Sequence, residues 1–193
     1  MQLTLCLVTK NKAMHTTTLH TAMTLNMLCM VKGIHLNIHF VTDQSGIQKN
    51  LKGCDRLVWL DYGVSVTQGT LEKILNSETT TVVPCVTEEV DWEKFRKKTL
   101  ENSTDPVYQR ALKFDIEASP KNEYISGVPR IFCIESKAAL KKLRDADAKF
   151  STFEHLKKIG LKISVLRSET VTCHYVYECI GNILESSGVR ASK

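Results

Sequence analysis

The chain has 193 residues and a net charge of +5, with 42% hydrophobic and 24% charged residues. This length suits one sizeable domain with its own core, and the composition is ordinary for a globular protein. Seven cysteines form no paired motif and lie mostly in apolar runs, which argues against a disulfide scaffold and favours a reducing compartment. No apolar run has the length of a membrane span, and the N-terminus starts in a strand-like segment without a signal peptide, so we expect a cytoplasmic protein.

The first forty residues favour a strand, a helix and a second strand. Residues 3–9 and 34–42 have the content of strands, and residues 13–31 the periodicity of a helix, which Asn11 could cap. Apolar residues recur at helical spacing in this helix, and we interpret them as its core-facing stripe. They are Leu19, Ala22, Met23, Met27 and Met30.

A second unit of the same kind follows. Residues 57–60 are four consecutive apolar residues, typical of a strand buried on both faces, and Asp61 ends that strand. Gly63 marks a bend, and Thr67 is a plausible cap for the next helix, which leads to a fourth strand at residues 80–86. This alternation predicts a mainly parallel sheet flanked by helices, with ligands bound outside the carboxyl ends of its strands.

The second half is less regular. Asp91 is expected to cap a short helix, and residues 102–123 are polar with little periodicity, which indicates a binding loop, a lid or a disordered segment. Within that segment, residues 109–115 could form one or two helical turns. Further strands are expected at residues 130–134 and 161–166, and further helices at 136–144, 153–159 and 175–186.

Three short motifs occur at the predicted strand ends. Val8-Thr9-Lys10-Asn11-Lys12 is similar to a Thr-x-Asn-Arg turn, Val41-Thr42-Asp43-Gln44-Ser45 to a Val-Asp-Asp-Gly-Ser motif, and Asp61-Tyr62-Gly63 to an Asp-x-Asp motif. In this order they resemble the nucleotide-binding half of GT-A glycosyltransferases of the family-two type. The second half is similar to small glycosyltransferase-like proteins of large DNA viruses.

The resemblance implies a single-domain, GT-A-like (Rossmann-related) α/β fold, with a nucleotide-binding half at residues 1–86 and an acceptor-side half at residues 87–193. The implied activity is transfer of a sugar from a nucleotide-sugar donor to a hydroxyl of a glycan or protein acceptor. On this resemblance, Asp61 would bind Mn²⁺ or Mg²⁺ at the diphosphate. The donor would also contact Thr9, Asn11, Lys12 and Asp43.

The chain departs from the family pattern at Gly63, where the second acid of the metal motif is absent. His174 is the later residue that we nominate as a further metal ligand. An inverting enzyme also needs a carboxylate base for the acceptor hydroxyl, and Asp115 is the candidate because it lies in the irregular segment. Its rivals are Glu88, Glu89, Asp91 and Glu117.

Two other readings of the sequence stay open. A non-catalytic relative could keep the fold as a binding or assembly module, either as a single chain or as a homodimer, and Gly63 favours this alternative. A Rossmann-like binder of nucleotides or nucleic acid is disfavoured, because the sequence has neither a Gly-x-Gly-x-x-Gly loop nor a basic stripe interleaved with aromatic residues.

Overall fold

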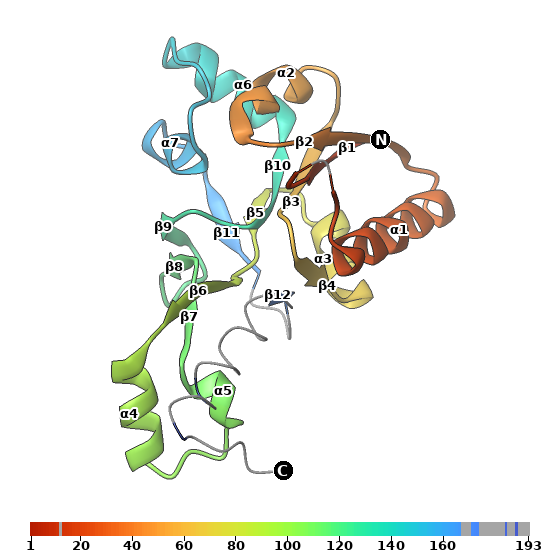
Figure 1. The fold of residues 1–193 in the computed structure, drawn as a ribbon. Coiled ribbons are helices and arrows are strands. Elements are labelled where there is room, and N and C mark those ends of the chain that lie inside the picture. The colour runs from red at the N-terminus through yellow and green to blue at the C-terminus, as the bar shows by residue number, and fades with distance from the viewer. Residues whose placement is uncertain (12, 167–170, 174–183, 185–187, 189–193) are drawn as a thin grey trace.

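The computed structural model describes residues 1–11, 13–166, 171–173, 184 and 188, and a six-stranded sheet forms its centre (Figure 1). The strand order is β11-β5-β10-β3-β1-β2. In chain order these strands are β1 Gln2–Val8, β2 His35–Val41, β3 Arg56–Leu60, β5 Thr80–Val82, β10 Ile131–Glu135 and β11 Ile163–Val165.

The other regular elements of the described residues are three two-stranded ribbons and eight helical segments. The ribbons pair β4 Val64–Val66 with β12 Val171–Cys173, β6 Val86–Val90 with β7 Leu112–Phe114, and β8 Ile116–Ala118 with β9 Tyr124–Gly127. The helical segments are α1 Thr16–Val31, η1 Gln44–Gly46, α2 Ile47–Leu51, α3 Gln68–Asn76, α4 Trp92–Leu100, α5 Val107–Arg110, α6 Ser136–Asp145 and α7 Phe153–Lys158.

The central sheet is mainly parallel. β1 pairs in parallel with both β2 and β3, and β11 pairs in parallel with β5. β10 runs antiparallel to both of its neighbours, β3 and β5, so all strands other than β10 share one direction. The predicted mixed α/β architecture with a mainly parallel sheet and flanking helices is therefore confirmed. The predicted fourth strand is shorter than expected, since β5 ends at Val82 and β6 joins a different ribbon.

Each face of the sheet is covered by its own apolar layer. On one face Leu5 of β1 and Val58 of β3 pack in a cluster with residues of α1 and α3. On the other face Cys6 and Trp59 pack in a second cluster with residues of α2, α6 and α7. Residues 57–60 are buried throughout, as their unbroken apolar run predicts. Burial raises the pKa of the Cys6 thiol to about 11, so this cysteine behaves as a small apolar residue.

Helix α1 differs from the prediction in two ways. It begins at Thr16, and His15 rather than Asn11 is its N-cap, with Nδ1 accepting the Thr17 main-chain N–H at 3.3 Å. Asn11 instead lies in a tight turn with a positive φ of 51°. The expected core stripe is also wrong in most of its members, because Met23, Met27 and Met30 are largely exposed and Ala22 is buried.

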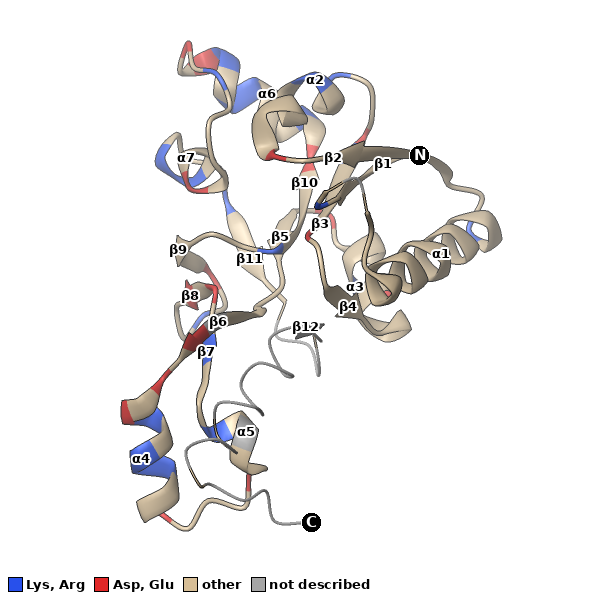
Figure 2. Ribbon diagram, viewed as in Figure 1, with Lys and Arg blue, Asp and Glu red and all other residues tan. Residues whose placement is uncertain are grey.

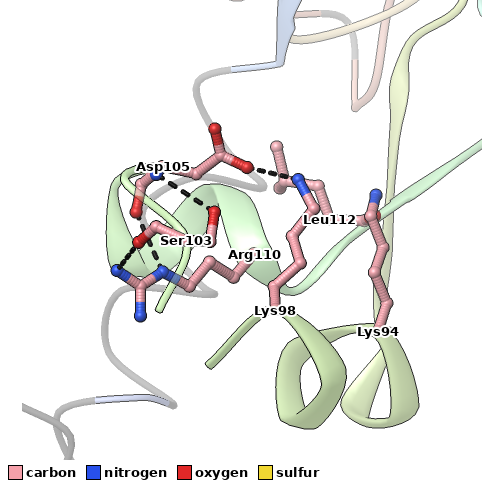
Figure 3. Close-up of polar contacts among 6 residues, drawn as sticks. All are labelled: Lys94, Lys98, Ser103, Asp105, Arg110 and Leu112. Atoms are coloured by element: carbon pink, nitrogen blue, oxygen red, sulfur yellow. Dashed lines mark hydrogen bonds and ion pairs between the residues drawn. The ribbon is translucent and has the colours of Figure 1, made fainter. Parts of the chain in front are cut away.

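The β6–β7 ribbon carries α4 and α5 away from the sheet, and we call residues 86–114 the arm (Figure 1). Asp91 caps α4 as predicted and accepts the Lys94 main-chain N–H at 2.9 Å. Polar contacts fix the arm's outer turn: Lys98 pairs with Asp105, and Arg110 donates to the carbonyls of Ser103 and Asp105 (Figure 3).

The prediction of an irregular loop over residues 102–123 is therefore only partly right. Short regular elements, namely α5, β7 and β8, occupy much of that segment, and two of them are strands that pair with residues far away in the chain or across a turn. In the described part of the chain, no helix is long and apolar enough to cross a membrane.

Candidate functional site at the carboxyl ends of the parallel strands

The loops that follow β1, β2 and β3 meet at one edge of the sheet, as the alternation of elements predicts. Leu7 of β1 lies opposite Leu60 of β3, and Val8 lies opposite Val41 of β2. The residues just beyond these pairs therefore leave the sheet side by side. The Thr9 main chain confirms the contact, since its N–H donates to the carbonyl of Val41 at 2.9 Å.

The order of the strands makes the gap between β1 and β3 a topological switch point. The connection after β1 runs through α1 to β2, which lies in the sheet on the side of β1 away from β3. The connection after β3 runs through β4 and α3 to β5, which lies on the side of β3 away from β1. Ligands of open α/β sheets bind in the crevice outside the carboxyl ends at such a point. The loops 9–11 and 61–63 border this position.

Asp61 is the carboxylate at the switch point. Its main-chain N–H donates to the carbonyl of Arg130 at 3.0 Å, and its Oδ1 accepts the Tyr62 main-chain N–H at 2.7 Å. Among the described residues its second oxygen, Oδ2, has no hydrogen-bond partner, and the residue is partly buried. One carboxylate oxygen is thus held by the turn, while the other makes no hydrogen bond within the described part of the chain.

Gly63 has a structural reason to be glycine. Its φ of +79° lies in the left-handed region, where a Cβ is disfavoured, and the adjacent Val64 N–H donates back to the carbonyl of Asp61 at 3.3 Å. The tight turn that orients Asp61 therefore favours glycine at this position, although Asp and Asn are the side chains that tolerate such a φ best.

The structure places a lysine, a tyrosine and a histidine together beside Asp61, a group that the sequence motifs did not indicate. The Lys10 ammonium lies 5.3 Å from the centre of the Tyr62 ring, within the range of a cation–π contact. His15, the cap of α1, meets the same ring edge-on at a centroid distance of 5.5 Å. Lys10 lies two residues beyond the end of β1, and Tyr62 lies two residues beyond the end of the adjacent parallel strand β3. These equivalent positions were the signal from which their contact could have been predicted.

Other predicted donor contacts have local partners. Thr9 directs its hydroxyl to the carbonyl of Val41 at 3.3 Å. Asp43 is exposed and caps the short helix η1, its Oδ1 accepting the Ser45 N–H at 2.8 Å. The hydrogen bonds from Ser45 lower the pKa of Asp43, so it stays ionised at neutral pH. The Asn11 side chain is exposed, and Lys12 lies outside the described residues.

The predicted metal ligands are described only in part. His174 lies outside the described residues, although β12 ends just before it, at Cys173, whose main-chain partner is Val64. Among the residues that the structure describes, no group of three or more His, Cys, Asp or Glu side chains could hold a metal ion.

Asp115, the predicted acceptor base, joins two segments of main chain. Its Oδ1 accepts the N–H of Cys85 and its Oδ2 accepts the N–H of Arg130, both at 2.8 Å. Burial raises its pKa to about 6, although both N–H donors favour the ionised form. These contacts favour a structural role, since Cys85 precedes the arm and Arg130 precedes β10. The catalytic role of Asp115 stays a prediction.

Three of the rival acids also have partners. Asp91 caps α4, Glu89 pairs with Lys113 within the arm, and Glu117 accepts the hydroxyl of Ser126 at 2.9 Å. Glu89 and Glu117 are exposed, and in the sequence both are far from the loops that follow β1, β2 and β3. The base of an inverting reaction is therefore not identified by these contacts.

A pocket lies between α2 and α6, away from the strand ends. This open pocket of about 660 Å³ has a mostly basic polar lining. Its lining residues are Gln48, Lys52, Lys137, Leu140, Lys141, Leu143, Arg144, Asp147 and Ala148.

Comparison with protein-family models finds no match, and comparison with curated proteins finds none either. Among solved structures, the fold is similar to that of the bifunctional IspDF from Campylobacter jejuni, with a TM-score of 0.44 and 12% sequence identity. The similar region covers 87% of this chain and 50% of that protein, so this chain spans about half of its length.

Proposed function

We propose that this chain binds the diphosphate of a nucleotide sugar at the carboxyl ends of β1, β2 and β3 and transfers the sugar to an acceptor hydroxyl. The observation that carries the proposal is Asp61. It stands at the switch point of a mainly parallel sheet, and within the described residues its Oδ2 has no partner. Lys10 and Tyr62 supply a cation and an aromatic ring beside it.

Each of these groups has a chemical use in the proposal. The Lys10 ammonium attracts the negative diphosphate, and its contact with Tyr62 limits where that charge can move. The exposed amide of Asn11 offers both donors and acceptors to the base or ribose. Asp61 itself would repel the diphosphate, so its presence makes sense with a cation between the two.

A divalent cation fits this arrangement. Mg²⁺ in nucleotide sites commonly takes one or two carboxylates and completes its coordination with phosphate oxygens and waters. Asp61 Oδ2 would be such a ligand, and His174 remains the predicted second one. A bound cation offsets the charge that develops on the diphosphate as it leaves. Asp115 accepts one main-chain N–H on each oxygen, and each oxygen keeps a further lone pair with which it could accept the acceptor's proton.

Thermal unfolding with a panel of nucleoside diphosphates and nucleotide sugars, each with and without Mn²⁺, tests binding. A ligand at 100 times its dissociation constant adds about 2.7 kcal/mol to the free energy of unfolding, which raises the melting temperature by roughly 5–10 °C for a domain of this size. We expect one nucleotide to give a Mn²⁺-dependent shift. The shift should disappear in Asp61→Asn.

The matched control is Asp145→Asn, an exposed acid of α6 with only a 3.7 Å contact to Arg144, and it should keep the shift. No shift with any donor, or a Mn²⁺-dependent shift that survives in Asp61→Asn, would count against the proposal. Release of nucleoside diphosphate from the donor that binds then tests catalysis.

The second candidate function is binding without catalysis. The hydrogen bonds that occupy both oxygens of Asp115 favour it, because they leave the predicted base engaged in the fold. A donor that binds with Mn²⁺ but releases no nucleoside diphosphate, even with candidate acceptors present, would support this alternative.

A further inference from the structure

The side of the molecule formed by α1 and β2 exposes large apolar side chains. Met23, Met27 and Met30 of α1 are 60–73% exposed, and Phe40 of β2 is 65% exposed. Single exposed apolar side chains are common on protein surfaces, but a large contiguous patch of them marks an interaction site. We call this group the α1–β2 surface, and it consists of Leu19, Met23, Met27, Met30, Ile38 and Phe40.

The register of the sheet places the β2 members on the side of α1. Ile38 lies opposite Leu5, and Phe40 lies opposite Leu7. Residues opposite one another in a parallel pair point to the same face, and these two leucines belong to the layer that α1 and α3 cover. The side chains of Ile38 and Phe40 therefore project on the face of β2 that borders α1.

The helix turns its exposed residues to the same side. Thr18 donates to the carbonyl of Val64, and Lys32 at the end of α1 donates to Asn76 at the end of α3, so one flank of α1 faces β4 and α3. At about 100° per residue, Met23 and Met30 lie on the opposite flank. Ile38 and Phe40 are exposed on the face of the sheet that α1 covers, so the two exposed groups lie on the same side of the molecule.

The strand edge beside this surface is open. β2 is the last strand of the sheet and pairs with β1 alone among the described residues. Edge strands are normally protected by lysine, proline or a bulge, and β2 has none of the three over its 7 residues. An unprotected edge is a template for another strand.

The surface also has no charge. A quarter of the chain is charged (24%), yet neither the 16 residues of α1 nor the 7 residues of β2 include Asp, Glu, Lys or Arg. Figure 2 shows both elements without the red and blue segments that mark α4 and α6. Apolar side chains on the inner and outer sides of a helix are typical of one that is covered on both.

We propose that the α1–β2 surface is the interface of a homodimer, in which β2 pairs antiparallel with β2 of a second copy around a twofold axis. A twofold axis sets each residue of the surface against the same surface, so an uncharged apolar surface is complementary to itself, whereas a charged one would be repelled. The six side chains present on the order of 600 Å² of apolar area per chain, and the strand edge adds to it; a stable interface buries about 800 Å² per partner.

Sedimentation equilibrium of the full chain tests the dimer. We expect the wild type to have twice the chain mass of 21.8 kDa at micromolar concentration. Met30→Lys places a charge in the interface and should raise the dissociation constant at least 100-fold. The control is Leu100→Lys on the arm, because Leu100 and Met30 are both 73% exposed, and this variant should remain dimeric.

A second variant, Phe40→Thr, replaces the aromatic ring with a β-branched residue that also favours strands, and it should also dissociate the dimer. Circular dichroism should show that both variants are folded. A monomeric wild type at 100 times that concentration would overturn the proposal. So would a dimer that persists in both folded variants, since its interface would lie elsewhere. The proposal is supported if the wild type and Leu100→Lys are dimers while Met30→Lys and Phe40→Thr are monomers.

Discussion

Replacing Asp115 with asparagine distinguishes a carboxylate that holds the fold together from one that takes part in chemistry. Its two oxygens accept the main-chain N–H groups of Cys85 and Arg130, each at 2.8 Å. An asparagine keeps one acceptor and turns an NH₂ donor toward the other N–H. One main-chain donor then loses its partner at the point where the arm and β10 leave a common junction.

The expected cost follows from these contacts. A hydrogen bond to a charged group contributes about 1.5–3 kcal/mol, and an unpaired buried donor costs about 1–3 kcal/mol. Part of this loss is recovered, because burial disfavours the ionised carboxylate and raises its pKa to about 6, whereas asparagine is neutral. We expect Asp115→Asn to lower the free energy of unfolding by about 2 kcal/mol at pH 7, or the melting temperature by about 4–8 °C.

Urea denaturation followed by circular dichroism measures this change. Glu117→Gln is the control, since Glu117 is an exposed acid on the next strand with a single hydrogen bond to Ser126, and its effect should stay within about 0.5 kcal/mol. If Asp115→Asn kept wild-type stability and lost only donor turnover, the structural role would be refuted and the role as a base supported.

Three more predictions concern stability, and the first two involve the same junction. Because the folded protein holds the Asp115 proton more tightly than the unfolded chain, the stability that this carboxylate contributes is greatest at low pH and is lost as pH rises through about 6. The cost of Asp115→Asn should therefore grow by about 1 kcal/mol between pH 7 and pH 5 in urea denaturation, and a cost that shrinks would contradict the raised pKa. Gly127→Ala should cost roughly 3 kcal/mol or more, since φ is +108° and a Cβ would lie 2.2 Å from the carbonyl oxygen of Asp115. Gly69→Ala in α3, where a Cβ meets nothing within 4 Å, should instead raise the free energy of unfolding by about 0.5–1 kcal/mol. Thermal denaturation measures both glycine variants, and equal effects would refute both predictions.

Local signals predicted the elements that depend on neighbours in the sequence. Thr67 and Asp91 cap their helices as expected, because a side-chain oxygen needs only the N–H groups of the next turn. The unbroken apolar run of β3 correctly indicated burial on both faces. The meeting of the loops after β1, β2 and β3 was also predicted, since parallel strands bring their carboxyl ends to one edge.

The face that α1 buries could not be read from its periodicity. Threonines 18 and 21 are buried because their hydroxyls bond the main chain of Val64 and Val66, and the close contact with β4 requires small side chains there. The methionines form an equally regular stripe on another flank. A pattern with two apolar stripes does not say which of them meets the core, and the choice depends on β4, which pairs with a strand a hundred residues away.

The insertion of β10 was beyond local reasoning for a similar reason. Its composition predicts a strand, but nothing in residues 131–135 says that it pairs antiparallel between β3 and β5. The contact of Lys10 with Tyr62 also depends on which strands are neighbours. Both features follow once the strand order is known.

The two proposals concern different edges of one sheet, and their geometry keeps them apart. The donor site lies at the carboxyl ends of β1 and β3, whereas the α1–β2 surface lies along the outer side of β2. Antiparallel pairing of β2 with its copy would point the carboxyl ends of the parallel strands in the two copies in opposite directions, so each proposed donor site would be built from one chain alone. Loss of the dimer in Met30→Lys and loss of the nucleotide shift in Asp61→Asn are therefore independent outcomes, and either proposal can fail while the other stands.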